Sequence, residues 1–128
     1  MDLQVKLFNL QDQGNHLIVL ARGAMDKTAF AEMFDEVKKA TQSLQECKVM
    51  VDLSDSTYEF NSGEIEAFVG ELPLDDWPRG NKVAFVSASE GADFYRLYLL
   101  RVAFVAQGLT MGVFRDAQTA IDWLAGHI

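Results

Sequence analysis

Apolar and polar residues occur in blocks along the chain, and the first two apolar blocks predict a pair of strands. Residues 3–10 and 16–22 are rich in Val, Leu and Ile. The polar segment 12–15 between them is typical of a tight turn, and Gly23 is expected to end the second strand. These features together predict a β-hairpin.

Four segments predict helices, because their apolar residues recur every three or four positions or because a capping residue precedes them. The first covers residues 26–45, with Asp26 as its N-cap. The second covers 62–72 and the third 92–107, where Gly108 ends it. The fourth is expected over 116–125. Five apolar residues form the stripe of the first helix: Phe30, Met33, Phe34, Val37 and Leu44.

Three short apolar runs between these helices predict strands that are buried on both faces. They cover residues 48–53, 83–87 and 109–114, and residues 54–62 are expected to form a loop. Strands that alternate with helices are typical of parallel βαβ crossovers. The sequence therefore predicts one α/β domain over residues 1–128. Its five-stranded mixed sheet and four helices are expected in the order β-β-α-β-α-β-α-β-α.

Charge and composition exclude several classes of partner and chemistry. The formal net charge is −8, with 19 acidic and 11 basic residues, which disfavours nucleic acid and strongly anionic membranes as partners. Eight of the acids lie between Asp52 and Asp76, a stretch without Lys or Arg. This stretch is interpreted as a solvated face, with a cation site or a basic partner as alternatives. Cys47 is the only cysteine, so no internal disulfide or cysteine-based zinc site is expected.

No recognisable catalytic motif is present, and no cofactor or metal is expected. His16 and His127 have no spacing typical of a metal pair or of a nucleophile with its base. The segment 87–91 follows a strand and precedes a helix, where α/β proteins often bind ligands. An interfacial hydrolase that uses Ser62 or Ser89 is a further alternative, but no base is visible beside either serine. No signal peptide is visible, so a cytoplasmic location is expected.

Nearly the whole chain carries a resemblance to known domains, since the first helix after Gly23 and the strand from Lys82 to Val86 fit the same template as two more specific segments. The run from Val51 to Gly63 resembles the strand, loop and helix of STAS domains, the fold of anti-sigma-factor antagonists. The ending Ala120-Ile121-Asp122-Trp123-Leu124 looks like the close of the SpoIIAA-like family. The resemblance implies a SpoIIAA/STAS-like fold and a regulatory domain that binds another protein. SpoIIAA-like domains are also similar to CRAL-TRIO domains, which carry apolar molecules in a cavity beneath mobile helices.

The resemblance also marks Ser62 as a candidate phosphorylation site. Phosphorylated STAS domains have Asp-Ser-Ser/Thr-Gly before the second helix, and here only Ser62 and Gly63 match that pattern. A phosphate is favourable at a helix N-terminus, but Glu64 and Glu66 lie beside it and would repel it. Ser62 as a plain helix cap is the competing interpretation.

The third predicted helix is apolar on nearly all sides. A helix on one face of a sheet normally has a polar back, whereas Arg96 and Arg101 are too far apart around this helix to form one. Each large apolar side chain left in water forgoes about 1.5–3 kcal/mol, so the helix should be covered. The cover is expected to be a neighbouring helix, a second copy in a homodimer, or an apolar ligand or membrane surface.

The favoured hypothesis is non-enzymatic binding or transport of a nonpolar, lipid-like molecule, with peripheral contact to a membrane. The second helix is short and contains Gly70, which suits a movable flap over a cavity bordered by the second and third helices. The alternative is a STAS-like regulatory protein-interaction domain. The candidate ligand- and membrane-binding residues are Ile65, Phe68, Val69, Leu72, Trp77, Phe94, Tyr95, Leu97, Tyr98, Val102 and Phe104.

Overall fold

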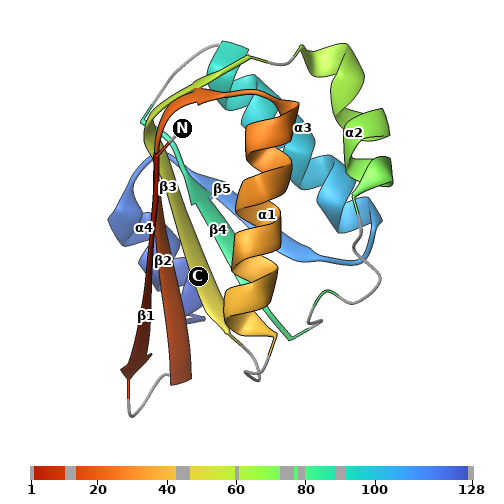
Figure 1. The fold of residues 1–128 in the computed structure, drawn as a ribbon. Helices are drawn as coiled ribbons and strands as arrows, with labels where there is room; N and C mark the ends of the chain where they lie inside the picture. The colour runs from red at the N-terminus through yellow and green to blue at the C-terminus, as the bar shows by residue number, and fades with distance from the viewer. Residues whose placement is uncertain are drawn as a thin grey trace.

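The strands form one sheet in the order β1-β2-β3-β4-β5 (Figure 1). β1 (Asp2–Leu10) pairs antiparallel with β2 (Gly14–Met25). From β2 onward the sheet is parallel through β3 (Lys48–Tyr58), β4 (Lys82–Val86) and β5 (Thr110–Phe114). Four parallel strands thus form the body of the sheet, and β1 extends it at the β2 edge.

The computed structural model describes the greater part of the chain, including every element named here. The described residues are 2–10, 14–42, 47–59, 61–72, 77, 80–88 and 92–126, with the backbone alone at 2–10, 14, 62, 92 and 93.

Four α-helices complete the α/β fold, and the predicted class and helix number are confirmed. They are α1 (Lys27–Thr41), α2 (Ile65–Glu71), α3 (Ala92–Ala106) and α4 (Ala117–Leu124), and a 3-10 helix, η1 (Ser62–Glu64), leads into α2. α1, α2 and α3 lie on one face of the sheet and α4 lies on the other (Figure 1). Right-handed crossovers between sequentially ordered parallel strands require this placement of the first three helices.

The helix ends follow capping signals that are visible in the sequence. The Asp26 carboxylate accepts a hydrogen bond of 2.8 Å from the Ala29 N–H, and Asp116 accepts one of 2.7 Å from the Thr119 N–H. Gly108 follows α3 with φ of 88°, a backbone conformation that favours glycine. α1 ends at Thr41, before the expected residue 45, and Leu44 of its predicted stripe lies outside the described residues.

Two predicted strand ends were wrong, because β2 and β3 continue as a paired ribbon beyond the other strands. β2 passes Gly23 and reaches Met25, and β3 runs through the predicted loop to Tyr58. Gly23 has φ of 102°, near the irregular register between Leu20 and Arg22. The Ser56 hydroxyl donates to the Ala21 carbonyl at 2.9 Å. The sequence did not predict this extension of β3, because most of its residues are polar and only alternate side chains are buried.

Aromatic rings fill the space between the sheet and the helices that cover it. The Phe34 and Phe104 rings stack with 4.6 Å between centroids, and Phe34 also lies 5.4 Å from Trp77. The Phe30 ring lies 5.8 Å from Phe68 and 6.1 Å from Phe85. The space left beside Phe34, Trp77 and Phe85 is only about 10 Å³, too small for more than one water molecule. Between α1 and the sheet, the described core is therefore filled by side chains.

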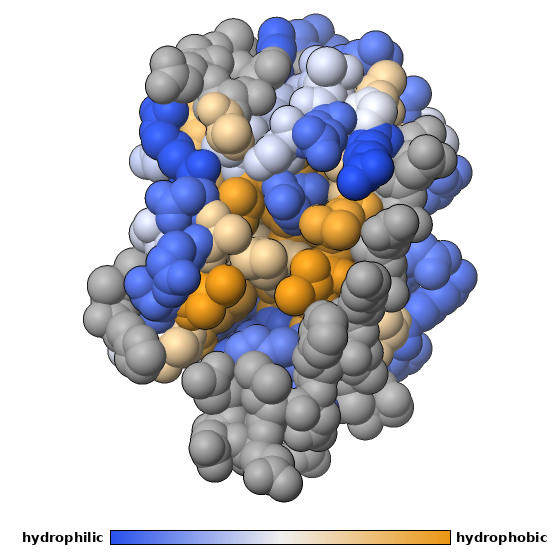
Figure 2. Space-filling view, turned by 90° about the vertical axis from the view of Figure 1, so that its left-hand side faces the viewer, coloured by the Kyte–Doolittle hydropathy of each residue, from blue (hydrophilic) through white to orange (hydrophobic). Residues whose placement is uncertain are grey.

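The opposite face of the sheet has a second, smaller core. Met50, Ala84 and Val86 pack there against Ala120 and Leu124 of α4. Figure 2 shows this side of the molecule, with apolar residues gathered in its centre beside a column of polar residues. A single helix covers this face.

Replacing Phe104 by Ala is expected to destabilise the protein by about 3–5 kcal/mol, since a fully buried ring is removed from the aromatic cluster. Urea denaturation monitored by circular dichroism measures the change. Val105→Ala is the matched control, because Val105 is the next residue on α3 and is 44% exposed. A similar loss in both variants would contradict the packing described here.

Candidate functional site

The side chains of α3 point to three different environments. Leu97, Leu100 and Phe104 are fully buried against the sheet. Leu99 and Ala103 are half-buried and face α2. A third set lies in solvent, with exposed fractions of 57%, 47%, 45% and 44%, and we call it the exposed stripe: Tyr95, Tyr98, Val102 and Val105. The prediction that α3 carries more apolar surface than its neighbours cover is confirmed.

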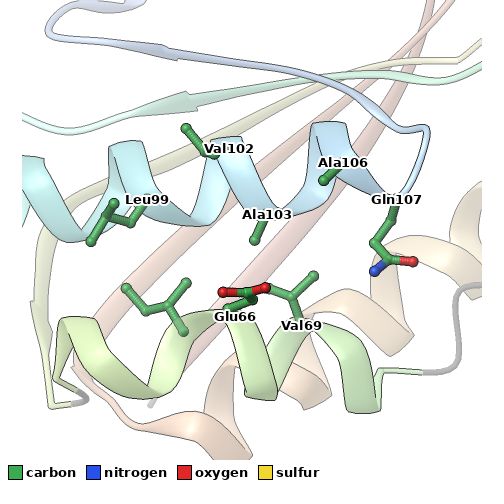
Figure 3. Close-up of a pocket in the computed structure, with 8 residues that line it drawn as sticks. Glu66, Val69, Leu99, Val102, Ala103, Ala106 and Gln107 are labelled. Carbon is green, nitrogen blue, oxygen red and sulfur yellow. The ribbon is translucent and has the colours of Figure 1, made fainter.

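A groove separates α2 from α3 beside the exposed stripe (Figure 3). Its volume is about 320 Å³, and it is open to solvent along one side. Seven residues from these two helices, and one that follows α3, line the α2–α3 groove: Ile65, Glu66, Val69, Leu99, Val102, Ala103, Ala106 and Gln107.

The length of α2 explains why this side of α3 stays open. At 1.5 Å per residue, the seven residues of α2 span about 10 Å and the fifteen of α3 span about 22 Å. α2 therefore covers only part of the flank of α3. The small side chains Ala103 and Ala106 deepen the gap on the α3 side, and Gly70 adds no side chain on the solvent side of α2.

The α2–α3 groove has two polar groups among its apolar side chains. The Glu66 carboxylate points from α2 toward Ala103, and the Gln107 amide lies at one end of the groove (Figure 3). The arrangement offers an apolar floor with one negative charge beside it, which can bind an apolar group that carries a cation or a hydrogen-bond donor.

An ion pair ties the start of α2 to the start of α1. The Lys27 ammonium lies 2.6 Å from the Glu64 carboxylate, and both side chains are about half exposed. The hydrogen bond, and then the opposite charge, lower the pKa of Glu64 and raise the pKa of Lys27. The contact is therefore present at neutral pH. It is lost as the pH falls through the lowered pKa of Glu64.

The predicted site residues divide between the surface and the core. Tyr95, Tyr98 and Val102 are exposed, whereas Ile65 and Val69 line the groove but are themselves buried, with exposed fractions of 2% and 1%. The remaining six are buried or partly covered by the protein itself: Phe68, Leu72, Trp77, Phe94, Leu97 and Phe104.

These covered residues have identified structural contacts. Trp77 packs on Phe34, and the Arg115 guanidinium lies 4.1 Å from the centre of the Phe94 ring. An incoming molecule meets the exposed and groove-lining members of the predicted set first, and their binding role stays a prediction.

Sequence reasoning missed several residues of this surface. Val105 belongs to the exposed stripe, and its spacing from Tyr95, Tyr98 and Val102 is the helical repeat that could have found it. Leu99, Ala103 and Ala106 also recur at helical spacing, but periodicity could not show that this side of the helix faces a groove. Glu66 and Gln107 gave no such signal, because the groove exists only where two helices meet.

Other predicted sites have less structural support. Within the described ranges, no cluster of His, Cys, Asp and Glu could hold a metal ion. The Ser62 side chain lies outside the described residues, as do Ser89 and His127. Two of the described acids in the stretch from Asp52 to Asp76 have a basic partner, since Asp55 lies 3.8 Å from Arg22 and Glu64 lies 2.6 Å from Lys27. None of the described helices is long and apolar enough to cross a membrane.

Comparison with known proteins places the fold. No family model and no curated protein matches the chain. A crystal structure of an uncharacterised DUF3478-family protein from Shewanella loihica PV-4, which has a SpoIIAA-like fold, is similar to 95% of this chain and 93% of its own. The TM-score is 0.59 at 18% sequence identity. The fold is SpoIIAA-like. At this identity the likeness describes the SpoIIAA-like architecture alone.

Replacing Lys27 by Met is expected to loosen α2 at neutral pH, since Glu64 loses its partner. Hydrogen exchange followed by mass spectrometry should show faster exchange in residues 65–71. In the wild type, the same increase is expected as the pH falls through the lowered pKa of Glu64, once intrinsic exchange rates are corrected.

Lys39→Met is the matched control, because Lys39 forms an exposed ion pair of 2.9 Å with Asp35 within α1. Equal exchange of residues 65–71 in both variants would show that the Lys27–Glu64 pair does not hold α2.

Proposed function

We propose that this chain is a STAS-like regulatory domain that binds another protein through the exposed stripe and the α2–α3 groove. The observation that carries the proposal is the exposed stripe, four apolar side chains about half exposed on one side of α3. Apolar patches of this kind, next to a groove, are typical of interaction sites. The SpoIIAA-like fold supports a regulatory domain of this type.

The size of the exposed stripe favours a transient complex. A tyrosine buries about 150–250 Å² when fully covered, so half-exposed Tyr95 and Tyr98 offer roughly 100 Å² each. Stable interfaces bury about 800 Å² on each partner. The stripe reaches that range only when the adjoining groove is used as well. A weak, reversible partner fits this surface better than a permanent second copy.

Disrupting the exposed stripe is expected to weaken partner binding. The tagged protein would be used to capture partners from an extract of its own source organism. A captured protein would then be purified and its affinity measured by calorimetry. Tyr98→Ser/Val102→Ser should weaken binding at least tenfold, because two apolar contacts are lost.

The matched control is Ile121→Ser on α4, on the other side of the sheet, since Ile121 is 43% exposed. It should change the affinity less than twofold. The proposal fails if the double variant and the control bind equally well, or if the purified chains do not bind at all.

A second candidate function is binding of a nonpolar small molecule in the α2–α3 groove. The groove volume of about 320 Å³ lies at the lower end of the range of small-molecule sites. Because the aromatic cluster fills the interior, such a molecule would bind between the helices and remain partly exposed. The same face would meet a neutral membrane surface through Tyr95 and Tyr98.

Filling the groove tests this second function. Ala103→Trp should displace any copurifying apolar molecule in native mass spectrometry and abolish the fluorescence increase of a hydrophobic dye. Ala67→Trp, at an exposed α2 position outside the groove lining, is the control and should leave both signals unchanged. Wild-type protein with no bound molecule, no dye signal and no flotation with phosphatidylcholine vesicles would exclude this function.

A further inference from the structure

The two sides of the α2–α3 groove differ in charge. On α2, the solvent-facing residues are acidic or small: Glu66, Ala67, Gly70 and Glu71. α2 contains no Lys or Arg. On α3, the neighbouring surface is the apolar exposed stripe. Neither arginine of α3, Arg96 or Arg101, is among the residues that line the groove, and the Arg101 Nε donates to the Met111 carbonyl of β5 at 3.2 Å. The α2 side of the groove thus carries one acidic residue, Glu66, beside the apolar Ile65 and Val69, while the α3 side is apolar as far as Gln107.

Glu66 is placed to receive a positive charge from outside. Its carboxylate points into the groove (Figure 3), and among the described residues no ion pair to it is found. Glu64, two residues earlier, is already paired with Lys27. Covering the Glu66 carboxylate with an apolar molecule would leave a charge without water or partner, which is costly. An occupant that covers the groove should therefore bring a cation.

A helix satisfies the groove better than an extended peptide does. The walls are two helices, whose backbone N–H and C=O groups are already paired within them, so they offer an extended strand few backbone partners. A helix carries its own backbone hydrogen bonds and presents only side chains. From Tyr95 to Val105 the exposed stripe covers eleven residues and rises about 15 Å, which matches roughly three turns of a partner helix.

From these features we infer that the partner segment is a basic amphipathic helix of another protein, seated in the α2–α3 groove with Lys or Arg facing Glu66. The inference rests on the proposed function and specifies the charge and the secondary structure of the partner segment. The apolar side chains of the partner helix recur every three or four positions and cover Leu99, Ala103 and Val102. The basic residues lie along the side that meets α2. The net charge of −8 disfavours a second copy of this chain in that place.

Two model peptides test the charge preference directly. Both are 14-residue amphipathic helices with leucine at the same positions, and the polar positions are lysine in one and glutamate in the other. At 0.15 M salt, the wild-type protein should bind the lysine peptide at least tenfold more tightly by fluorescence anisotropy. In NMR spectra of the protein, the amides of Leu99 and Ala103 should shift on titration.

A charge reversal at Glu66 separates local contact from general attraction. Glu66→Lys should weaken the lysine peptide about tenfold and strengthen the glutamate peptide. Glu32→Lys changes the net charge equally, on α1, which contributes no residue to the groove lining. It should change either affinity less than twofold. Equal effects of the two reversals would overturn the inference, because attraction by net charge would then suffice.

The stripe variant distinguishes failure of this inference from failure of the proposed function. If Tyr98→Ser/Val102→Ser abolishes binding of the captured natural partner and Glu66→Lys does not weaken it, the interaction site stands and the basic helix is wrong. If neither variant changes partner binding, both proposals fail. Dimerisation in sedimentation experiments that is lost in the stripe variant would also overturn the inference, since a second copy would occupy the face.

Discussion

The handedness of the crossovers is the constraint on which the rest of this structure depends. The parallel strands follow one another in sequence order, so three right-handed crossovers place α1, α2 and α3 on the same face. α1 packs on β2, and α3 packs on β3 and β5. α2 packs chiefly against α3. Crowding of one face therefore produces a helix–helix groove at the surface, while the opposite face has only α4.

Packing in the core decides what kind of molecule this face can receive. A carrier of the CRAL-TRIO type needs empty space beneath its helices. Here the Phe30 ring packs against the rings of Phe68, Phe85 and Phe104, and the Phe34 ring stacks on Phe104. Such a core is dense, and opening it would expose several aromatic side chains at a cost of a few kcal/mol each. Any recognition is therefore expected at the surface, between α2 and α3.

The surface around the α2–α3 groove combines exposed apolar side chains with a negative charge, and one partner can satisfy both. The exposed stripe leaves apolar area in water, and the acidic α2 side holds charge beside an apolar groove. A partner that is apolar and basic satisfies both at once, whereas a lipid tail or a second acidic copy satisfies only one. The Lys27–Glu64 pair neutralises one acid at the start of α2 and leaves Glu66 for the groove. Under the proposed function, the position of these two acids on either side of the start of α2 would determine which partners bind.

Periodicity by itself determined the α/β class, the helices and the excess of apolar surface on α3. The capping residues Asp26 and Asp116 accept hydrogen bonds from backbone N–H groups three residues later, so the local sequence was sufficient to predict them. The extension of β3 to Tyr58 escaped prediction, because Ser54 to Thr57 are polar and only pairing with β2 makes them a strand. Which apolar residues face solvent was also a tertiary decision. Phe104 and Val105 are adjacent in the sequence and both are apolar. Phe104 is buried because it faces the sheet, whereas Val105 is 44% exposed because no other element covers its side of α3 among the described residues.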